Sequence, residues 1–152
     1  MTQRLDYRKA APDGMVAMRG LENYVRHCGL APSLLELVRM RVSQINGCAY
    51  CLDMHSKDAR AQGETEQRLH VLPAWRETTL YDERERAALE WTEAVTQVSD
   101  GGVPDEVYER ARRHFSEKQL VDLTLAVIAI NGWNRLAIPF RAPAGSYQPG
   151  RR

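Results

Sequence analysis

The apolar side chains of this chain recur at spacings of three and four residues, which is the period of an amphipathic helix. Met18, Leu21, Val25 and Cys28 show this spacing early in the sequence, and the stretch 120–130 is the most apolar. No stretch of useful length alternates apolar and polar residues as a half-exposed β-strand does. The pattern therefore predicts an all-α fold, a helical bundle of six to seven helices.

Helix caps and breakers divide this pattern into separate helices. Asp13 is placed to cap a first helix that ends at Gly29, and Ser33 with Glu36 forms a capping-box pattern at the start of a second. Asn46-Gly47 ends or sharply bends that second helix. Further helices are expected over about 48–62, 65–72, 82–98, 104–114 and 116–136.

The length and composition suit a single domain covering residues 1–152. The chain has 43% hydrophobic and 27% charged residues, which is ordinary for a globular protein. The segments at about 1–12 and 140–152 are more polar, and the second is rich in turn residues. We therefore expect loosely ordered termini around one helical core.

The charge balance excludes some partners. Lysine and arginine number 21 against 20 aspartate and glutamate, so the net charge is +1 and no basic stripe for nucleic acid is expected. A small uncharged substrate needs no electrostatic steering, which agrees with this balance. The stretch 120–130 contains Asp122 and is shorter than the roughly 20 residues that span a membrane, and no secretory signal precedes it. We expect a cytoplasmic protein with reduced thiols and no membrane partner.

Three cysteines are too few for a disulfide scaffold, so their spacing matters more than their number. Cys48 and Cys51 form a Cys-x-x-Cys pair, and His55 follows four residues later. No strand precedes the pair, which removes the context of a thioredoxin-like motif. Leu52 directly follows the second cysteine, where c-type haem attachment needs histidine. Cys28 lies on the apolar face of the first helix and is expected to be a structural thiol.

On a helix, the two thiols of the pair lie on one face, close enough to form a disulfide with local adjustment. Helical side chains lean towards the N-terminus, so the His55 imidazole is carried back over the turn that holds Cys51. Cys48 is about 10 Å further along the axis, so His55 serves Cys51 more easily as a base. Both thiols are expected in the first turn, where the helix N-terminus favours thiolates.

Glu36 completes this arrangement if Asn46-Gly47 folds the two helices into an antiparallel hairpin. Glu36 lies eleven residues before the turn and His55 eight after it, counted in the printed sequence, so the two come to similar heights. A carboxylate that orients a histidine beside a thiol follows the logic of a catalytic triad. The order predicted is Glu36, His55, Cys51, with Cys48 as the resolving thiol. The competing interpretation of Glu36 is the capping box alone.

The pattern Glu36-x11-Cys48-x2-Cys51-x3-His55 resembles the AhpD-like alkylhydroperoxidase group of the carboxymuconolactone decarboxylase superfamily. The resemblance is strong over about 31–61 and extends more loosely to the motif Asn131-Gly-Trp-Asn-Arg135. It implies an all-α fold and a thiol-dependent peroxidase, an oxidoreductase in which Cys51 attacks the peroxide and Cys48 closes the disulfide.

The resemblance also implies partners. The substrate is a hydroperoxide, an external dithiol of lipoyl or thioredoxin type resets the disulfide, and the chain forms a homo-oligomer, a trimer or hexamer. Tyr50 stands where better-studied relatives have a histidine between the cysteines, and it is a possible site-lining residue. No glycine-rich phosphate loop is present and no metal is implied, so no bound cofactor is expected.

Other interpretations of these residues remain open. A lyase like the carboxymuconolactone decarboxylases is one, although that branch generally works without the cysteine pair. A non-catalytic redox sensor is another, and a metal site made by the pair, His55 and Glu36 is a third. In the second motif, Trp133 is expected in the core, and Asn134 and Arg135 in a buried polar contact or a subunit interface. His27, His70 and His114 are expected to be structural or exposed.

Overall fold

The computed structural model describes residues 2–150, and over that range it contains helices and turns without a β-strand. The all-α prediction is therefore confirmed, but the described residues form eight α-helices and one 3-10 helix instead of the six to seven helices expected. The elements are α1 (Tyr7–Ala10), α2 (Pro12–His27), α3 (Pro32–Asn46), α4 (Ala49–Ala61), α5 (Glu66–Val71), the 3-10 helix η1 (Leu72–Glu77), α6 (Glu83–Thr96), α7 (Asp105–His114) and α8 (Glu117–Phe140).

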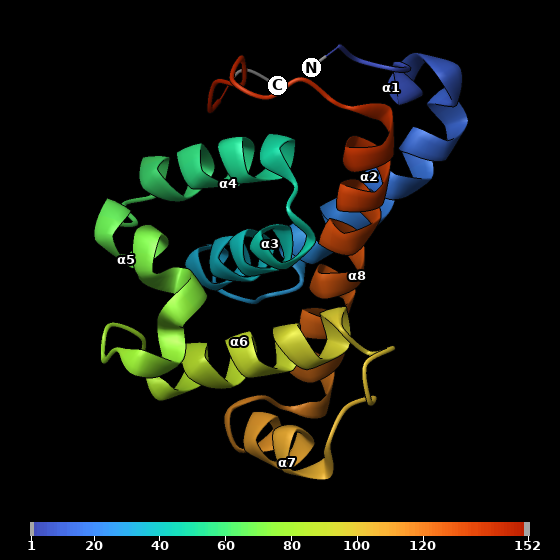
Figure 1. The fold of residues 1–152 in the computed structure, drawn as a ribbon. Coiled ribbons are helices and arrows are strands. Elements are labelled where there is room, and N and C mark those ends of the chain that lie inside the picture. The colour runs from blue at the N-terminus through green and yellow to red at the C-terminus, as the bar shows by residue number, and fades with distance from the viewer. Residues whose placement is uncertain (1, 151–152) are drawn as a thin grey trace.

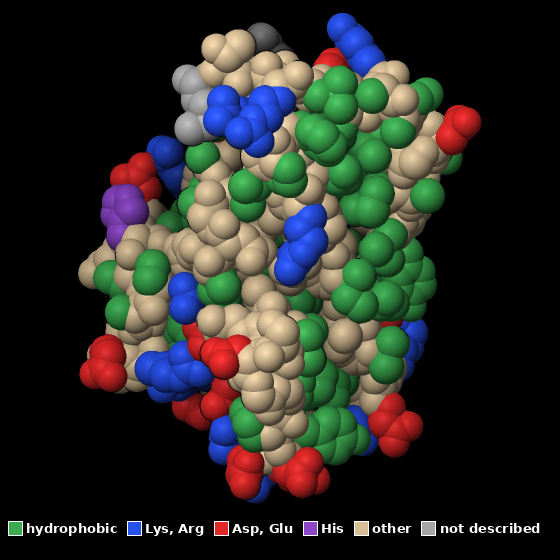
Figure 2. Space-filling model, turned by 45° about the vertical axis from the view of Figure 1, so that its right-hand side comes forward, with side chains coloured by type: hydrophobic (Ala, Val, Ile, Leu, Met, Phe, Trp, Pro, Cys, Tyr) green, Lys and Arg blue, Asp and Glu red, His purple; other side chains and the backbone are tan. Residues whose placement is uncertain are grey.

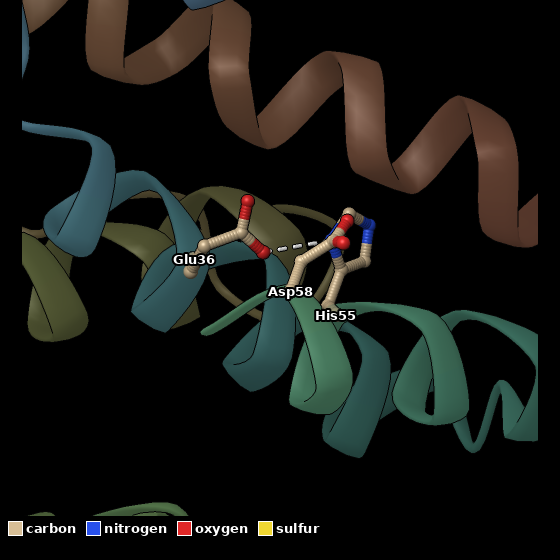
Figure 3. A group of neighbouring side chains, drawn as sticks. All are labelled: Glu36, His55 and Asp58. Atoms are coloured by element: carbon tan, nitrogen blue, oxygen red, sulfur yellow. Dashed lines mark hydrogen bonds and ion pairs between the residues drawn. The ribbon is translucent and has the colours of Figure 1, made fainter. Parts of the chain in front are cut away.

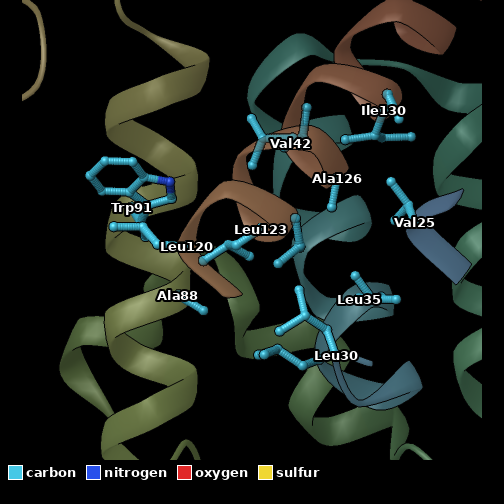
Figure 4. Close-up of a cluster of buried hydrophobic side chains, with 14 of the residues drawn as sticks. Val25, Leu30, Leu35, Val42, Ala88, Trp91, Leu120, Leu123, Ala126 and Ile130 are labelled. Carbon is cyan, nitrogen blue, oxygen red and sulfur yellow. The ribbon is translucent and has the colours of Figure 1, made fainter. Parts of the chain in front are cut away.

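Helix α3 is the centre of the bundle and packs against α4, α6 and α8 (Figure 1). Helix α8 crosses the bundle and also contacts α2. The main hydrophobic core lies where α2, α3, α6 and α8 meet (Figure 4), and its labelled members are Val25, Leu30, Leu35, Val42, Ala88, Trp91, Leu120, Leu123, Ala126 and Ile130. Helix α8 is long and apolar enough to span a membrane by length and composition, but here it is a core helix of the bundle.

The predicted hairpin is formed by α3 and α4. Gly47 ends α3 in the left-handed conformation, with φ of 68°, which glycine adopts without steric cost. Cys48 follows as the N-cap of α4. The break at Asn46-Gly47 is therefore confirmed, and it places the two cysteines at the start of α4.

Two helix starts differ from the predictions. A short helix, α1, is capped by Asp6, and α2 begins at Pro12, so Asp13 lies in its first turn instead of capping it. Helix α3 begins at Pro32, and the expected capping box of Ser33 does not form. Proline is preorganised for the first helical position, because its φ is already helical and it has no N–H to satisfy. In both cases it moves the start ahead of the expected cap.

The later boundaries agree more closely. The capping boxes that open α6 and α8 are both present. Helix α6 ends at Thr96, short of the exposed Val98. Helix α8 runs on to Phe140, past the expected end near residue 136, and contains Pro139 in its last turn. Past Pro73, where a helix stop was expected, the chain continues as η1.

The C-terminal tail is attached to α4, which differs from the loosely held tail we expected. Lys57 donates hydrogen bonds to the backbone oxygens of Gly145 and Tyr147, and the Gly145 N–H donates to Asp53. The Tyr147 hydroxyl donates to Asp58 at 2.7 Å. The α4 side chains that make these contacts are polar. No local sequence pattern indicates that they pair with the tail. At the other end, Tyr7 is buried and lies in the helix α1, so this part of the N-terminal segment is ordered as well.

Candidate active site

Glu36 of α3 and His55 of α4 face one another across the hairpin (Figure 3). The His55 Nδ1 and the Glu36 Oε2 are 2.9 Å apart, and each residue is only 5% exposed. The hydrogen bond fixes the ring so that Nε2 lies on the side away from Glu36 (Figure 3). The predicted contact between these two residues is therefore present, and Glu36 takes part in it instead of capping α3.

The second oxygen of Glu36 accepts a hydrogen bond from Arg39 at 2.7 Å. Arg39 is also 5% exposed and donates through its other nitrogen to Glu22 of α2 at 2.6 Å. Burial raises the pKa of Glu36, but the hydrogen bonds and charges of His55 and Arg39 outweigh it and lower the pKa overall. Glu36 is therefore a carboxylate at neutral pH and acts as the hydrogen-bond partner of His55 Nδ1.

Asp58 is the third member of this buried group (Figure 3). Ligand-type atoms of Glu36, His55 and Asp58 all lie within 4.8 Å of one another. Among residues 2–150 this is the set close enough together to hold a metal ion, and it contains neither Cys48 nor Cys51. Glu36 binds Arg39 and His55, and Asp58 accepts a hydrogen bond from Tyr147, so each of the three side chains has a protein partner.

The two thiols at the start of α4 share a proton. Both cysteines are 1% exposed, and both are in the reduced, unpaired state. The thiol of Cys51 donates towards the sulfur of Cys48, and this hydrogen bond, with the backbone amides of Cys51 and Tyr50, lowers the pKa of Cys48 to about 7. The same shared proton, together with burial, raises the pKa of Cys51.

This asymmetry corrects the prediction that the helix N-terminus favours thiolates at both positions. The backbone amides of Cys51 and Tyr50, at the start of α4, lower the pKa of Cys48. Repulsion by a negative charge on Cys48 opposes a second thiolate, and it adds to the hydrogen bond and the burial that raise the pKa of Cys51. Cys48 is therefore the more acidic of the two thiols.

Asn134 of α8 is a further buried polar residue that acts on the two thiols. It is completely buried, donates to the Ser43 hydroxyl at 3.2 Å and accepts from the Asn46 amide at 2.9 Å. Its hydrogen bonds to the two thiols lower the pKa of each. The expectation of a buried polar contact at Asn134 is confirmed, and its contact with the thiols was missed. The signal was an amide in an apolar helix, because buried amides are nearly always hydrogen-bonded.

A cavity of about 190 Å³ leads to Cys51 and His55, both of which line it. Tyr50 lines it too, as the sequence indicated, while Cys48 is not among the lining residues. Trp133, expected in the core, is partly buried and forms part of the cavity wall. The other lining residues come mostly from α1 and α2, and they are Tyr7, Arg8, Met15, Arg19, Glu22, Arg26 and Met54.

The remaining residues singled out from the sequence lie outside this cavity. Cys28 is half-buried at the C-terminal end of α2. Arg135 is exposed and donates to Asn131. His27 and His70 are exposed, and His114 is half-buried at the end of α7.

Comparison with known proteins identifies a family and relatives of this chain. The model of the carboxymuconolactone decarboxylase family matches residues 10–94. The uncharacterized protein YdfG of Bacillus subtilis is 47% identical over 146 residues, which cover 96% of this chain and 99% of YdfG. The uncharacterized protein YnjA of Escherichia coli is 31% identical over 98 residues, 64% of this chain and 53% of YnjA.

Two solved structures share the fold. The crystal structure of ATU0492 from Agrobacterium tumefaciens, a protein of unknown function named as a candidate antioxidant defence protein AhpD, is 43% identical. It superposes with a TM-score of 0.93 and covers 96% of this chain and 100% of its own. The debrominase Bmp8 has a TM-score of 0.81 at 22% identity, over 91% of this chain and 74% of its own, and so shows the fold alone.

Proposed function

Because the chain belongs to the carboxymuconolactone decarboxylase family, in its AhpD-like group, we propose that it is a thiol-dependent peroxidase that uses Cys48 and Cys51. The observation that carries this proposal is the shared cavity: Cys51 and His55 line it together, and Glu36 holds the imidazole from behind. A carboxylate that orients an imidazole beside a thiol is an arrangement that activates a cysteine nucleophile.

The first step is the attack of Cys51 on the hydroperoxide. Cys51 is the thiol that faces the cavity, and its proton passes to His55, whose positive charge the Glu36 carboxylate stabilises. The thiolate attacks the distal oxygen and the O–O bond breaks. The departing alkoxide takes the proton back from His55, which leaves an alcohol and the sulfenic acid of Cys51.

The second step closes the disulfide. With a pKa of about 7, Cys48 is about half thiolate at neutral pH, and it lies beside the sulfenic acid without facing the cavity. Its sulfur attacks the sulfur of Cys51, and the hydroxide that leaves takes one proton from the solvent to become water. The low pKa therefore suits Cys48 to resolve the intermediate.

The cycle is completed by an external dithiol of lipoyl or thioredoxin type, which reduces the disulfide by thiol exchange. Electrons come from this partner and no bound cofactor takes part in the proposal. We place the activity in the cytoplasm, where such reductants keep thiols reduced.

A homo-oligomer, a trimer or hexamer, is also proposed. Hydrophobic side chains gather along the face that α2 and α8 form (Figure 2). Val16 is 61% exposed there, Val121 59% and Ile128 49%. Apolar patches of this kind commonly mark contacts between subunits.

A thiol map by mass spectrometry before and after one equivalent of hydroperoxide tests the mechanism. We expect one Cys48–Cys51 disulfide and a free Cys28, and loss of peroxide turnover in Cys51→Ser but not in the matched control Cys28→Ser. Equal peroxide consumption by Cys51→Ser and the native protein would overturn the proposal. Disulfide formation without repeated turnover favours a redox sensor, and bound zinc released when the thiols are blocked favours a metal site.

A lyase is the second candidate, because the matching family model is that of the carboxymuconolactone decarboxylases. Such a reaction would use the Glu36–His55 pair for proton transfer and leave the thiols unused. Decarboxylation of a carboxylated lactone that survives in the Cys48→Ser, Cys51→Ser double variant supports this candidate. Loss of both decarboxylation and peroxide turnover in that double variant, with the fold intact by circular dichroism, supports the peroxidase.

A further inference from the structure

The cavity above Cys51 has two kinds of lining. Its wall is apolar and aromatic, with Met15, Met54 and Trp133 as the main contributors. Arg8 and Arg19, both exposed, also line it. A ligand that reaches Cys51 therefore meets apolar side chains and cationic ones in the same cavity.

The side chains in contact with Arg8 are neutral, and Asp6 acts on it only through its charge, without an ion pair. Arg8 donates to the Tyr50 hydroxyl at 3.0 Å, and its guanidinium lies 5.0 Å and 5.4 Å from the ring centres of Tyr7 and Tyr50, which are neutral partners. Within residues 2–150, neither Arg8 nor Arg19 forms an ion pair with a carboxylate. Two cations that form no ion pair among the described residues, beside an apolar cavity, indicate a site for an anion.

Glu22, the acidic residue of the lining, already pairs with other arginines. Glu22 accepts a hydrogen bond from the buried Arg39 at 2.6 Å and pairs with Arg26 at 3.5 Å. Its charge is therefore balanced within the protein, and Arg26 is balanced with it. The net positive charge of the cavity comes from Arg8 and Arg19.

The size of the cavity points to an organic molecule. Its volume of about 190 Å³ is several times the roughly 30 Å³ that one water occupies in the liquid. Hydrogen peroxide has only two heavy atoms, so it would make little contact with the methionine and tryptophan side chains of the wall. A cavity for a drug-sized ligand is larger, about 300–1,000 Å³, so a small organic body fits best.

We propose that this cavity selects an organic hydroperoxide that carries a carboxylate, with the hydroperoxide group at Cys51 and the carboxylate at Arg8 and Arg19. The inference rests on the proposed function and names its substrate class. The apolar part of the molecule lies against Met15, Met54 and Trp133. The O–O bond breaks as described above, and the alcohol that leaves keeps its carboxylate.

Cumene hydroperoxide with a carboxylate at the para position, and the methyl ester of the same compound, provide matched substrates that differ in charge. With a dithiol reductant, we expect kcat/KM for the acid to exceed that for the ester by about tenfold at low salt, because charge-assisted bonds to a carboxylate are strong. The preference should fall as the salt concentration rises. In the Arg8→Gln, Arg19→Gln double variant the ratio should approach one, while the control Arg113→Gln should keep the native ratio.

Binding of the peroxide-free acid, 4-isopropylbenzoate, and of its methyl ester separates this inference from the proposed function. Isothermal titration should show tighter binding of the acid to the native protein and no preference in the double variant. Equal binding of the acid and the ester, or a preference that survives in the double variant, overturns the inference. Preferred binding of the acid without turnover of either hydroperoxide overturns the peroxidase and leaves the anion site in place.

Discussion

Replacement of Cys51 by alanine removes the proton donor that holds Cys48 as a thiolate. The hydrogen bond from Cys51 is the largest of the effects that set the pKa of Cys48 at about 7. A hydrogen bond to a charged group contributes about 1.5–3 kcal/mol, and one pKa unit corresponds to about 1.36 kcal/mol. We therefore expect the pKa of Cys48 to rise by about one to two units in Cys51→Ala, so that its thiolate fraction at neutral pH falls from about half to roughly 1–10%.

Cys51→Ser is the matched control, because its hydroxyl can still donate to the sulfur of Cys48. In this variant the pKa of Cys48 should stay closer to 7 than in the alanine variant. Both substitutions are made in a Cys28→Ser background, so that Cys48 is the one thiol left to titrate. The ultraviolet absorbance of the thiolate and the rate of alkylation by iodoacetamide, each followed against pH, give the pKa directly.

An unchanged pKa of Cys48 in Cys51→Ala would refute this reasoning. It would mean that the backbone amides at the start of α4, not the shared proton, set the ionisation of Cys48. The ionisation of Cys48 also determines how the rate of disulfide closure depends on pH. Because the native Cys48 loses its charge as the pH falls through about 7, disulfide closure should slow below that pH.

Three further substitutions test the surroundings of the pair. His55→Gln should lower kcat/KM for hydroperoxide by about 10²–10⁴-fold, the usual contribution of a general base, and native-like stopped-flow traces would contradict the relay. Tyr147→Phe should lower the free energy of unfolding in urea by about 1 kcal/mol because Asp58 loses a hydrogen bond, whereas the control Tyr108→Phe should not. Asn134→Ala should raise the pKa of Cys48 and cost about 1–3 kcal/mol of stability by leaving buried partners unpaired, which thiolate titration and urea unfolding measure.

Local signals were sufficient to predict the hairpin. The left-handed glycine at Gly47 and the helical rise of 1.5 Å per residue together place Glu36 and His55 at one height. The predicted starts of α2 and α3 were wrong, because a proline and a side-chain cap favour helix starts at nearly the same position. At Pro12 and Pro32 the proline determined the start.

The surroundings of the relay depended on contacts that the sequence does not specify. Arg39 could have been found, since it follows Glu36 by three residues and such pairs face one another on a helix. Glu22 and Tyr147 could not, because their positions depend on how α2 crosses α3 and where the tail returns. The proton shared by the two cysteines was missed for a different reason. The helix N-terminus was considered for each thiol separately, although the ionisation of each changes that of the other.

The net charge of the chain also had to be interpreted locally. A value of +1 suggested that the substrate is uncharged, because no long-range attraction would steer an ion to the protein. Total charge, however, includes carboxylates and arginines that neutralise one another, as Arg110 and Glu90 do outside the cavity. Recognition depends on the charges within a few ångströms of the ligand, since salt screens more distant ones. At the cavity those charges are Arg8 and Arg19, so a nearly neutral protein can still select an anion.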